Sequence, residues 1–319
     1  MQVTDQGDHT DLFGEDDPYM DRRRGQMADM LIAYARKGGV GKTTEALALA
    51  NRAANRGLRT VLIDGNRGQG DLRSILRLVK NRMPSVFDAA VSGDCARAII
   101  PPSTLNKYRP DNLEEVRFAF VSAPPATELT DPTLVTAEVY RRVVAEARSR
   151  ADLVIFDTQI VEAHDTTGII DRLVIPELRA GAWGLGLCDL SLSGLKNLVE
   201  YNKTLMKRHG VSRDRLLIAL NRIFPETPYR QEVMQRQLSP AGIFLGAVQV
   251  DPMITDQINR GHIPGDGGVF DEMLDAVLYR VTGREEFDPE IARARNLAQA
   301  QAKAPRRRGF LGLGRKARS

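Results

Sequence analysis

The sequence predicts an α/β fold with a single doubly wound, mainly parallel β-sheet flanked by helices. Between residues 29 and 283, short apolar runs alternate with amphipathic stretches of helical spacing. The apolar runs lack the polar–apolar alternation of strands that keep one face in water, which indicates strands covered on both faces. Strands that alternate with helices are typical of parallel sheets joined by crossover helices.

The elements follow from these patterns in chain order. Strands are predicted at 31–35, 60–64, 116–123, 152–157, 172–178, 183–188, 215–221 and 243–250. Helices are predicted at 43–56, 134–150, 192–209, 228–238 and 270–282. We expect them to form one domain at 29–285, between an acidic leader at 1–28 and a basic tail at 286–319.

The composition argues against several classes of protein. With 42% hydrophobic and 27% charged residues, the 319-residue chain has the make-up of an ordinary globular protein. Cys95 and Cys188 form no C-x-x-C pair, so we expect small buried apolar residues rather than a disulfide. The histidines show no metal-ligand spacing, so no zinc site is expected. Surface or loop positions are expected for His9, His164, His209 and His262.

The charge is distributed unevenly along the chain. Residues 1–21 hold seven acidic residues and no basic one, whereas nine Lys or Arg and no acidic residue follow Glu290. There is no secretory signal and no uncharged apolar run of the roughly 18–20 residues that a membrane helix needs. We therefore expect a cytoplasmic protein, with peripheral attachment to the inner face of the cell membrane as the alternative.

The residues that carry chemistry are "RKGGVGKTT" at 36–44, where a predicted strand meets a predicted helix. The P-loop pattern G-x-x-x-x-G-K-[ST] fails at its first position alone, which is Arg36. Glycines here allow backbone N–H groups to converge on phosphate oxygens in front of a helix N-terminus. The pattern predicts a nucleotide site made by Gly38, Gly39, Val40, Gly41, Lys42, Thr43 and Thr44.

The side chains of this loop suit ATP with Mg²⁺. Lys42 can reach the β- and γ-phosphates, the Thr43 hydroxyl can ligate Mg²⁺, and Thr44 is placed for the α-phosphate. Arg36 is expected to point outward, with a phosphate or a partner subunit as its alternative contacts. The P-loop pattern does not explain the second lysine, Lys37.

"KGGVGKTT" resembles the deviant Walker A motif of the ParA/MinD family, a branch of the P-loop ATPases. The resemblance implies that Lys37 reaches across an ATP-dependent homodimer toward the nucleotide of the other subunit. Further segments resemble the family in the same order: "RTVLIDGNRGQGDL" (59–72, strand and switch I), "SVFDAAVSGDCARAI" (85–99, a short helical segment), "ADLVIFDT" (151–158, Walker B), "LIALNRI" (217–223) and "VQVDPMITDQINRGHIP" (248–264).

The resemblance also implies roles for residues in these segments. Asp157 would face Mg²⁺ through a water molecule. Asn221 would hydrogen-bond the adenine base, with Arg222 beside it.

Two switch segments depart from the family. Switch I usually reads D-x-D, but here Asp64 is followed by Asn66, and an amide can hold the attacking water without accepting its proton. Switch II reads "DTQIVEAHD" in place of D-[TS]-P-x-G. Glu162 or Asp165 could act as a water-facing carboxylate, although a solvated loop charge is the favoured role for both. ATP binding is therefore expected, with slow hydrolysis.

The basic tail is predicted to bind a surface. In "KAPRRRGFLGLGRKARS" (303–319), basic residues flank Phe310, Leu311 and Leu313, which resembles the membrane-targeting tail of MinD-type proteins. An anionic membrane is the favoured surface, because contacts with DNA phosphates would need no apolar side chains such as Phe310 and Leu311. Non-specific DNA binding follows, and an inert solvated end is the third possibility.

The sequence thus favours a ParA/MinD-type ATPase. ATP would drive dimerisation, the dimer would bind a surface, and hydrolysis would release it, so that a cargo such as a plasmid, chromosome, or division or secretion machinery is positioned. An unidentified activating or cargo protein would complete the system. The alternative is a dimeric scaffold that binds ATP, hydrolyses it poorly and marks the location of a pilus, secretion or conjugation apparatus.

Overall fold

The computed structural model of the chain describes residues 12–13, 27–67, 71–78, 83–128, 131, 133–161, 167–228, 230–264, 269–291 and 294. The tail residues Phe310, Leu311 and Leu313, most of the acidic leader, and the switch II residues Glu162 and Asp165 lie outside this range. His9 and His164 lie outside it as well. In the part of the chain that is described, no helix is both long and apolar enough to cross a membrane.

A sheet of eight strands forms the centre of the molecule, in the order β3-β4-β2-β5-β1-β6-β7-β8. All neighbours pair in parallel except β3 and β4, which are antiparallel at the edge. The predicted fold class is therefore confirmed. The strands are β1 (Asp29–Ala35), β2 (Thr60–Gly65), β3 (Ile99–Ile100), β4 (Ala119–Val121), β5 (Leu153–Thr158), β6 (Trp183–Cys188), β7 (Leu216–Ile223) and β8 (Ile243–Gln249).

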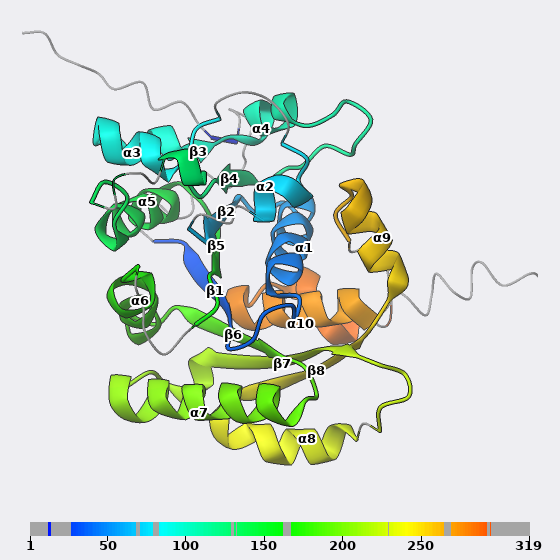
Figure 1. The fold of residues 1–319 in the computed structure, drawn as a ribbon. Helices are drawn as coiled ribbons and strands as arrows, with labels where there is room; N and C mark the ends of the chain where they lie inside the picture. The colour runs from blue at the N-terminus through cyan, green and yellow to red at the C-terminus, as the bar shows by residue number, and fades with distance from the viewer. Residues whose placement is uncertain are drawn as a thin grey trace, which may run out of the picture.

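Helices cover both faces of this sheet (Figure 1). They are α1 (Lys42–Asn55), α2 (Asp71–Ile75), α3 (Val86–Ser92), α4 (Pro102–Tyr108), α5 (Ala137–Arg150), α6 (Ile175–Arg179), α7 (Leu192–His209), α8 (Gln231–Leu238), α9 (Pro252–Arg260) and α10 (Val269–Thr282). Figure 1 shows α1 and α10 on one face and α5, α6 and α7 on the other. The expected short helix within 85–99 is α3.

The central strand explains why the apolar runs do not alternate with polar residues. Met30, Ile32 and Tyr34 of β1 belong to the buried cluster on the α5–α7 face. Leu31 and Ala33 belong to the cluster that packs on α1 and α10. Because successive side chains of a strand point to opposite faces, a strand covered on both sides must be apolar throughout.

The predicted strand at 172–178 is wrong. Residues Ile170–Val174 form a π-helical turn that continues into α6. The buried side chains of this segment are Ile170, Leu173, Val174, Ile175 and Leu178, and most of them follow a helical spacing toward one side. An apolar run indicates burial, but it does not by itself separate a buried helix from a buried strand.

Smaller differences concern strand length and cysteine burial. The strand predicted at 116–123 is confined to the three residues of β4, and the short edge strand β3 was not predicted. Cys188 is buried as expected, but Cys95 is partly exposed. His209 ends α7 and His262 follows α9, which are the surface and loop positions expected for them.

An ion-pair group fastens α10 to α1. The Arg52 guanidinium donates two hydrogen bonds of 2.6 Å to the Asp275 carboxylate and one of 2.6 Å to Asp271. Both carboxylates are buried. A bidentate arginine–carboxylate pair fixes direction as well as distance, so these contacts hold the N-terminal half of α10 against the last turn of α1.

Candidate functional site

The loop between β1 and α1 is shaped by its glycines. Gly39 and Gly41 have φ angles of 74° and 91°, a region that side chains with a Cβ rarely adopt. A Cβ on Gly41 would also lie 2.4 Å from Asn221 Nδ2. Gly41 is the N-cap of the 14-residue α1 and makes no side-chain cap, so the first N–H groups of this helix are available to an anion.

A cavity of about 480 Å³ opens in front of this helix start. Most of the predicted site residues line it: Lys37, Gly38, Gly39, Val40, Gly41, Lys42, Thr43, Thr44, Asn66, Asn221 and Arg222. Asp64 and Asp157 are buried at the ends of β2 and β5, where they are directly paired in register. The structure therefore brings together all the residues that the sequence assigned to one site.

The lysine of the loop is held by a buried carboxylate. Lys42 Nζ lies 2.5 Å from Asp157 Oδ1, and both side chains are almost fully buried. Burial raises the pKa of Asp157, while Lys42 and the Thr43 hydroxyl act in the opposite direction. A phosphate group in the cavity would offer Lys42 a second anionic partner.

Asp64 and Asp157 form a carboxylate pair suited to a cation. Burial, followed by the nearby Asp157, raises the pKa of Asp64 to about 8. Each of the two carboxylates keeps one buried oxygen that has no hydrogen-bond partner within the described ranges. Together with the Thr43 hydroxyl they form an oxygen-only donor set, which is the kind that Mg²⁺ prefers. The residues present therefore fit a magnesium ion beside Lys42.

A hydrogen bond from its own backbone N–H holds Asn66 in place. Its N–H donates to Asp64 Oδ1 over 2.9 Å. Its side-chain Nδ2 lies 3.5 Å from Oδ2 of Asp71, the first residue of α2. Asp71 also lines the cavity, and sequence reasoning did not select it.

Two residues at the end of β7 contact the glycine loop. Asn221 Nδ2 donates to the Val40 carbonyl over 3.1 Å, and its Oδ1 accepts from the backbone N–H of Arg222. Arg222 Nη1 donates to the Gly39 carbonyl over 2.6 Å. Both residues lie at the cavity, but their side chains donate to the loop backbone in this structure, so the contact of Asn221 with adenine stays a prediction.

One wall of the cavity was missed by sequence reasoning. It consists of Gln249, Val250, Asp251, Ile254, Thr255, Ile258 and Phe270, from the end of β8, from α9 and from the start of α10. Asp251 caps α9 by accepting a hydrogen bond of 2.8 Å from the Met253 N–H. Apolar side chains of this kind suit a flat aromatic base. In the sequence, the 248–264 segment resembles the family, but no residue of that segment was assigned to the site.

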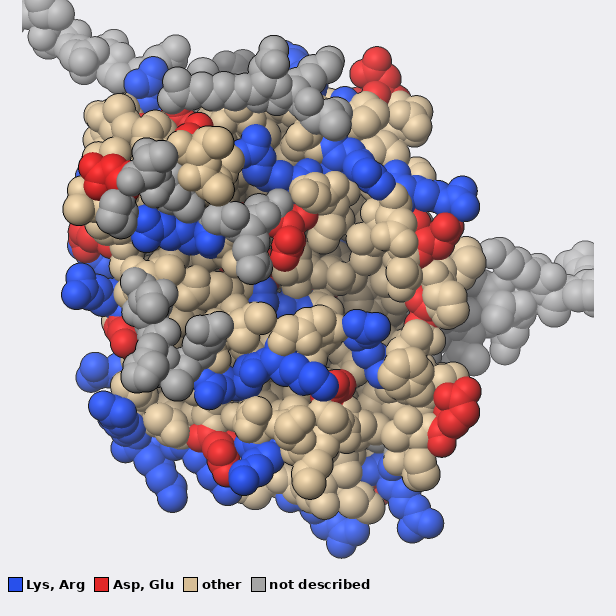
Figure 2. All heavy atoms as spheres, viewed as in Figure 1, with Lys and Arg blue, Asp and Glu red and all other residues tan. Residues whose placement is uncertain are grey.

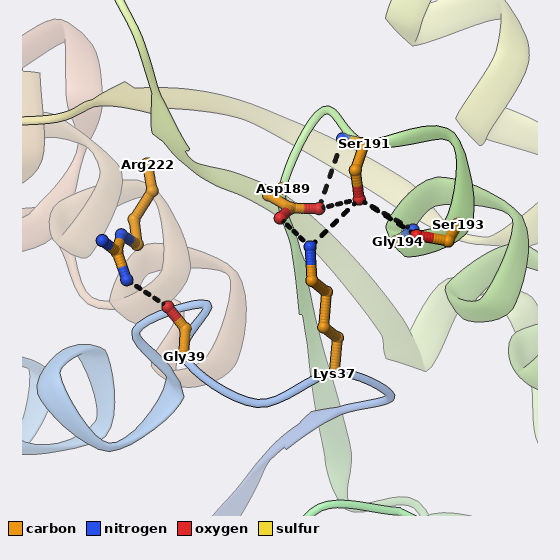
Figure 3. A network of polar contacts seen from close by, with 7 residues as sticks. All are labelled: Lys37, Gly39, Asp189, Ser191, Ser193, Gly194 and Arg222. Atoms are coloured by element: carbon orange, nitrogen blue, oxygen red, sulfur yellow. Dashed lines mark hydrogen bonds and ion pairs between the residues drawn. The ribbon is translucent and has the colours of Figure 1, made fainter.

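Lys37 makes an ion pair within its own chain. Its Nζ lies 2.5 Å from Asp189 Oδ2 and 3.3 Å from Ser191 Oγ, in the loop between β6 and α7. Ser191 also donates to Asp189 Oδ1 over 2.5 Å and caps α7 through the Gly194 N–H. Figure 3 shows Lys37 extending from the glycine loop into this group, with Arg222 turned toward Gly39.

The expectation that Arg36 points outward is wrong. Its Nη1 donates to the Val161 carbonyl over 2.5 Å, and its guanidinium lies 5.5 Å from the ring centre of Tyr201. A guanidinium is weakly hydrated and stacks readily on an aromatic ring. Arg36 therefore links the glycine loop to α7, on the side away from the cavity.

Comparison with known proteins supports a nucleotide-binding domain. Residues 31–264 match the family model of the CobQ/CobB/MinD/ParA nucleotide binding domain. The chain is 28% identical over 123 residues to the septum site-determining protein MinD of Escherichia coli K12, an alignment that spans 39% of this chain and 41% of that protein.

Two solved structures share the fold. The cell division ATPase MinD of Pyrococcus furiosus aligns with a TM-score of 0.60 and 15% identity over 79% of this chain and 98% of that one. MinD of Pyrococcus horikoshii, complexed with Mg-ADP, aligns with a TM-score of 0.58 and 14% identity over 87% and 100%. Because the family model covers most of the chain, the protein belongs to the CobQ/CobB/MinD/ParA nucleotide-binding family.

Proposed function

We propose that this chain is a ParA/MinD-type ATPase that positions a cargo through ATP-dependent dimerisation and binding to a surface. The observation that carries the proposal is the buried Lys42–Asp157 pair at the start of α1, beside two carboxylate oxygens that have no hydrogen-bond partner among the residues that the structure describes. Such a group suits a phosphate chain with its Mg²⁺. The Mg-ADP complex of the Pyrococcus horikoshii protein, which has the same fold, supports this proposal.

The proposal assigns a task to each part of the cavity. The backbone of Gly38, Gly39, Val40 and Gly41 would hold phosphate oxygens, with Thr44 at the α-phosphate and Lys42 at the β- and γ-phosphates. Thr43 and Asp157 would hold Mg²⁺, Asp157 through water. The base would lie against the α9 wall, near Asn221 and Arg222.

Mg-ATP binding and hydrolysis test this function directly. We expect the purified protein to bind a fluorescent ATP analogue and to hydrolyse ATP slowly, with stimulation by either anionic liposomes or plasmid DNA. No binding of ATP with Mg²⁺ present would contradict the proposal. Hydrolysis that is absent under all conditions but present in Asn66→Asp would favour the scaffold, which the amide at position 66 supports.

We also propose that the chain divides into a leader at 1–28, an ATPase domain at 29–285 and a surface-binding tail at 286–319. The described domain adds basic side chains to those of the tail. Figure 2 shows Lys and Arg gathered along the lower edge of the molecule, over α7 and α8. On α7 the basic residues include Lys196, Lys203, Lys207 and Arg208. Either an anionic membrane or DNA is compatible with such a surface.

Dimerisation would require Lys37 to leave Asp189. The ion pair is partly exposed, with 43% of the Lys37 side chain and 24% of the Asp189 side chain accessible. Exposed pairs contribute about 0.2–1 kcal/mol, and a dimer must break two of them. We expect Asp189→Asn to tighten ATP-dependent dimerisation by roughly three- to tenfold, measured by sedimentation with a non-hydrolysable ATP analogue.

Two further variants serve as controls for this measurement of dimerisation. Lys37→Ala should abolish the ATP-dependent dimer, because the cation that acts across the interface is lost. Glu138→Gln removes a different exposed ion pair, with Arg141 on α5, and should leave dimerisation unchanged. A dimer dissociation constant of Asp189→Asn equal to that of the unmodified protein would show that Asp189 does not restrain Lys37.

A further inference from the structure

Switch I lacks the carboxylate that ParA/MinD-type proteins usually carry at position 66, but a carboxylate lies directly beside that position. Oδ2 of Asp71 is 3.5 Å from Asn66 Nδ2. Both residues line the cavity that also contains Lys42 and Thr43. Asp71 is five residues further along the chain, at the start of α2, and its side chain is exposed toward the cavity.

The charge of Asp71 acts on the buried carboxylates of the site. It contributes to the raised pKa of Asp64 and to that of Asp157, although burial is the largest cause for both. Asp71 therefore lies within electrostatic range of the carboxylate that holds Lys42. A charge at this place would also act on a γ-phosphate bound by Lys42, since unscreened like charges repel over such distances.

The fold does not require a carboxylate at this position. Leu72 is the residue of α2 that is buried in the core, whereas Asp71 is exposed. An aspartate in the first turn of a helix is a common and mildly stabilising arrangement. Stabilising the helix in this way does not require the side chain to point in a particular direction. Here the Asp71 side chain lies beside Asn66 and lines the cavity.

We propose that Asp71 is the carboxylate that positions the attacking water, with Asn66 orienting it, which rests on the proposed ATPase function. The oxygen of that water forms a bond to the γ-phosphorus while the bond from phosphorus to the bridging oxygen of ADP breaks. One water proton passes to the Asp71 carboxylate and from there to solvent or to the released phosphate. Asn66 and Asp71 together thus take the place of the single aspartate of other family members.

Nucleotide affinity tests the position of Asp71 without depending on turnover. A negative charge beside the γ-phosphate disfavours ATP but acts much less on ADP. Asp71→Asn should therefore bind a fluorescent, non-hydrolysable ATP analogue about three- to tenfold more tightly, with its ADP affinity unchanged. Asp111→Asn is the matched control, because Asp111 is an exposed aspartate outside the cavity. Equal changes in ATP and ADP affinity, or no change in either, would overturn the proposal.

Single-turnover hydrolysis tests its role in the reaction. Asp71→Asn should slow hydrolysis roughly 10- to 100-fold without weakening ATP binding. The exchange variant Asn66→Asp/Asp71→Asn returns the carboxylate to position 66 and should recover most of the rate. If Asp71→Asn hydrolyses ATP at the unmodified rate, Asp71 is not the water-positioning group. Failure of the unmodified protein to bind ATP would instead refute the proposed function as a whole.

Discussion

Replacing Lys42 by methionine should lower the free energy of unfolding of the nucleotide-free protein by about 3–5 kcal/mol, because one member of a buried ion pair would lose its partner. Asp157 is 1% exposed and would remain without a cation in the core of the site. The same substitution removes the lysine proposed to reach the β- and γ-phosphates within the subunit, so ATP binding should fall below detection. Urea unfolding and titration with a fluorescent ATP analogue measure the two effects.

A double variant separates the two roles of Lys42. In Lys42→Met/Asp157→Asn the uncompensated charge is gone, so most of the lost stability should return while ATP binding stays absent. Lys42→Met as stable as the unmodified protein would mean that the pair contributes nothing to the nucleotide-free fold. Binding of ATP by the double variant would show that other groups suffice to hold the phosphates.

Replacing Glu45 by methionine should make the protein more stable, and increasingly so as the pH rises. Glu45 lies in the first turn of α1, is fully buried, and neither carboxylate oxygen has a hydrogen-bond partner in the described part of the chain. Burial raises its pKa from 4.5 to about 8. A carboxyl group that stays protonated in the native state loses its proton more easily in the unfolded state. The free energy of unfolding therefore falls as the pH rises from 4.5 to about 8.

The size of this effect follows from the difference between the two pKa values. At 1.36 kcal/mol for each pH unit, raising the pKa from 4.5 to about 8 corresponds to a stability loss of about 5 kcal/mol between pH 4 and pH 8. Glu45→Met should remove this loss and should be more stable than the unmodified protein at pH 8 by up to that amount. Urea unfolding at pH 5, 6.5 and 8 in the presence of EDTA measures it without interference from metal ions.

Glu45→Gln provides the control for shape. It keeps the length and polarity of the side chain but does not titrate, so its stability should also lose this part of the pH dependence. Asp64, whose pKa is also raised to about 8, contributes its own pH dependence to the stability of every variant. If Glu45→Met and the unmodified protein lose stability equally between pH 5 and 8, Glu45 is not buried as a protonated acid.

Much of the site could be predicted because its determinants are local. The left-handed backbone at Gly39 and Gly41 is a property of glycine itself, and the strand and helix on either side follow from their own residue patterns. Asp64 and Asp157 end apolar strands, and parallel strands place their carboxyl ends at the same edge of a sheet. The place of Asp64 and Asp157 at the nucleotide site was implied by the family resemblance, and this geometry of parallel strands explains why they lie near Lys42.

The contacts that control the site were decided by the tertiary structure. Lys37 meets Asp189 across 152 positions of the chain, and Arg36 meets Val161 across 125, because separate loops converge at one edge of the sheet. Residues 170–178 became helical because their buried side chains pack on one side, which an apolar run alone does not specify. The sequence by itself determined most of the strands, the glycine loop and the acidic strand ends, since each depends on neighbouring residues. Only the tertiary structure decided which side chains contact the glycine loop and the acidic strand ends, because those contacts come from segments that are far apart in the sequence.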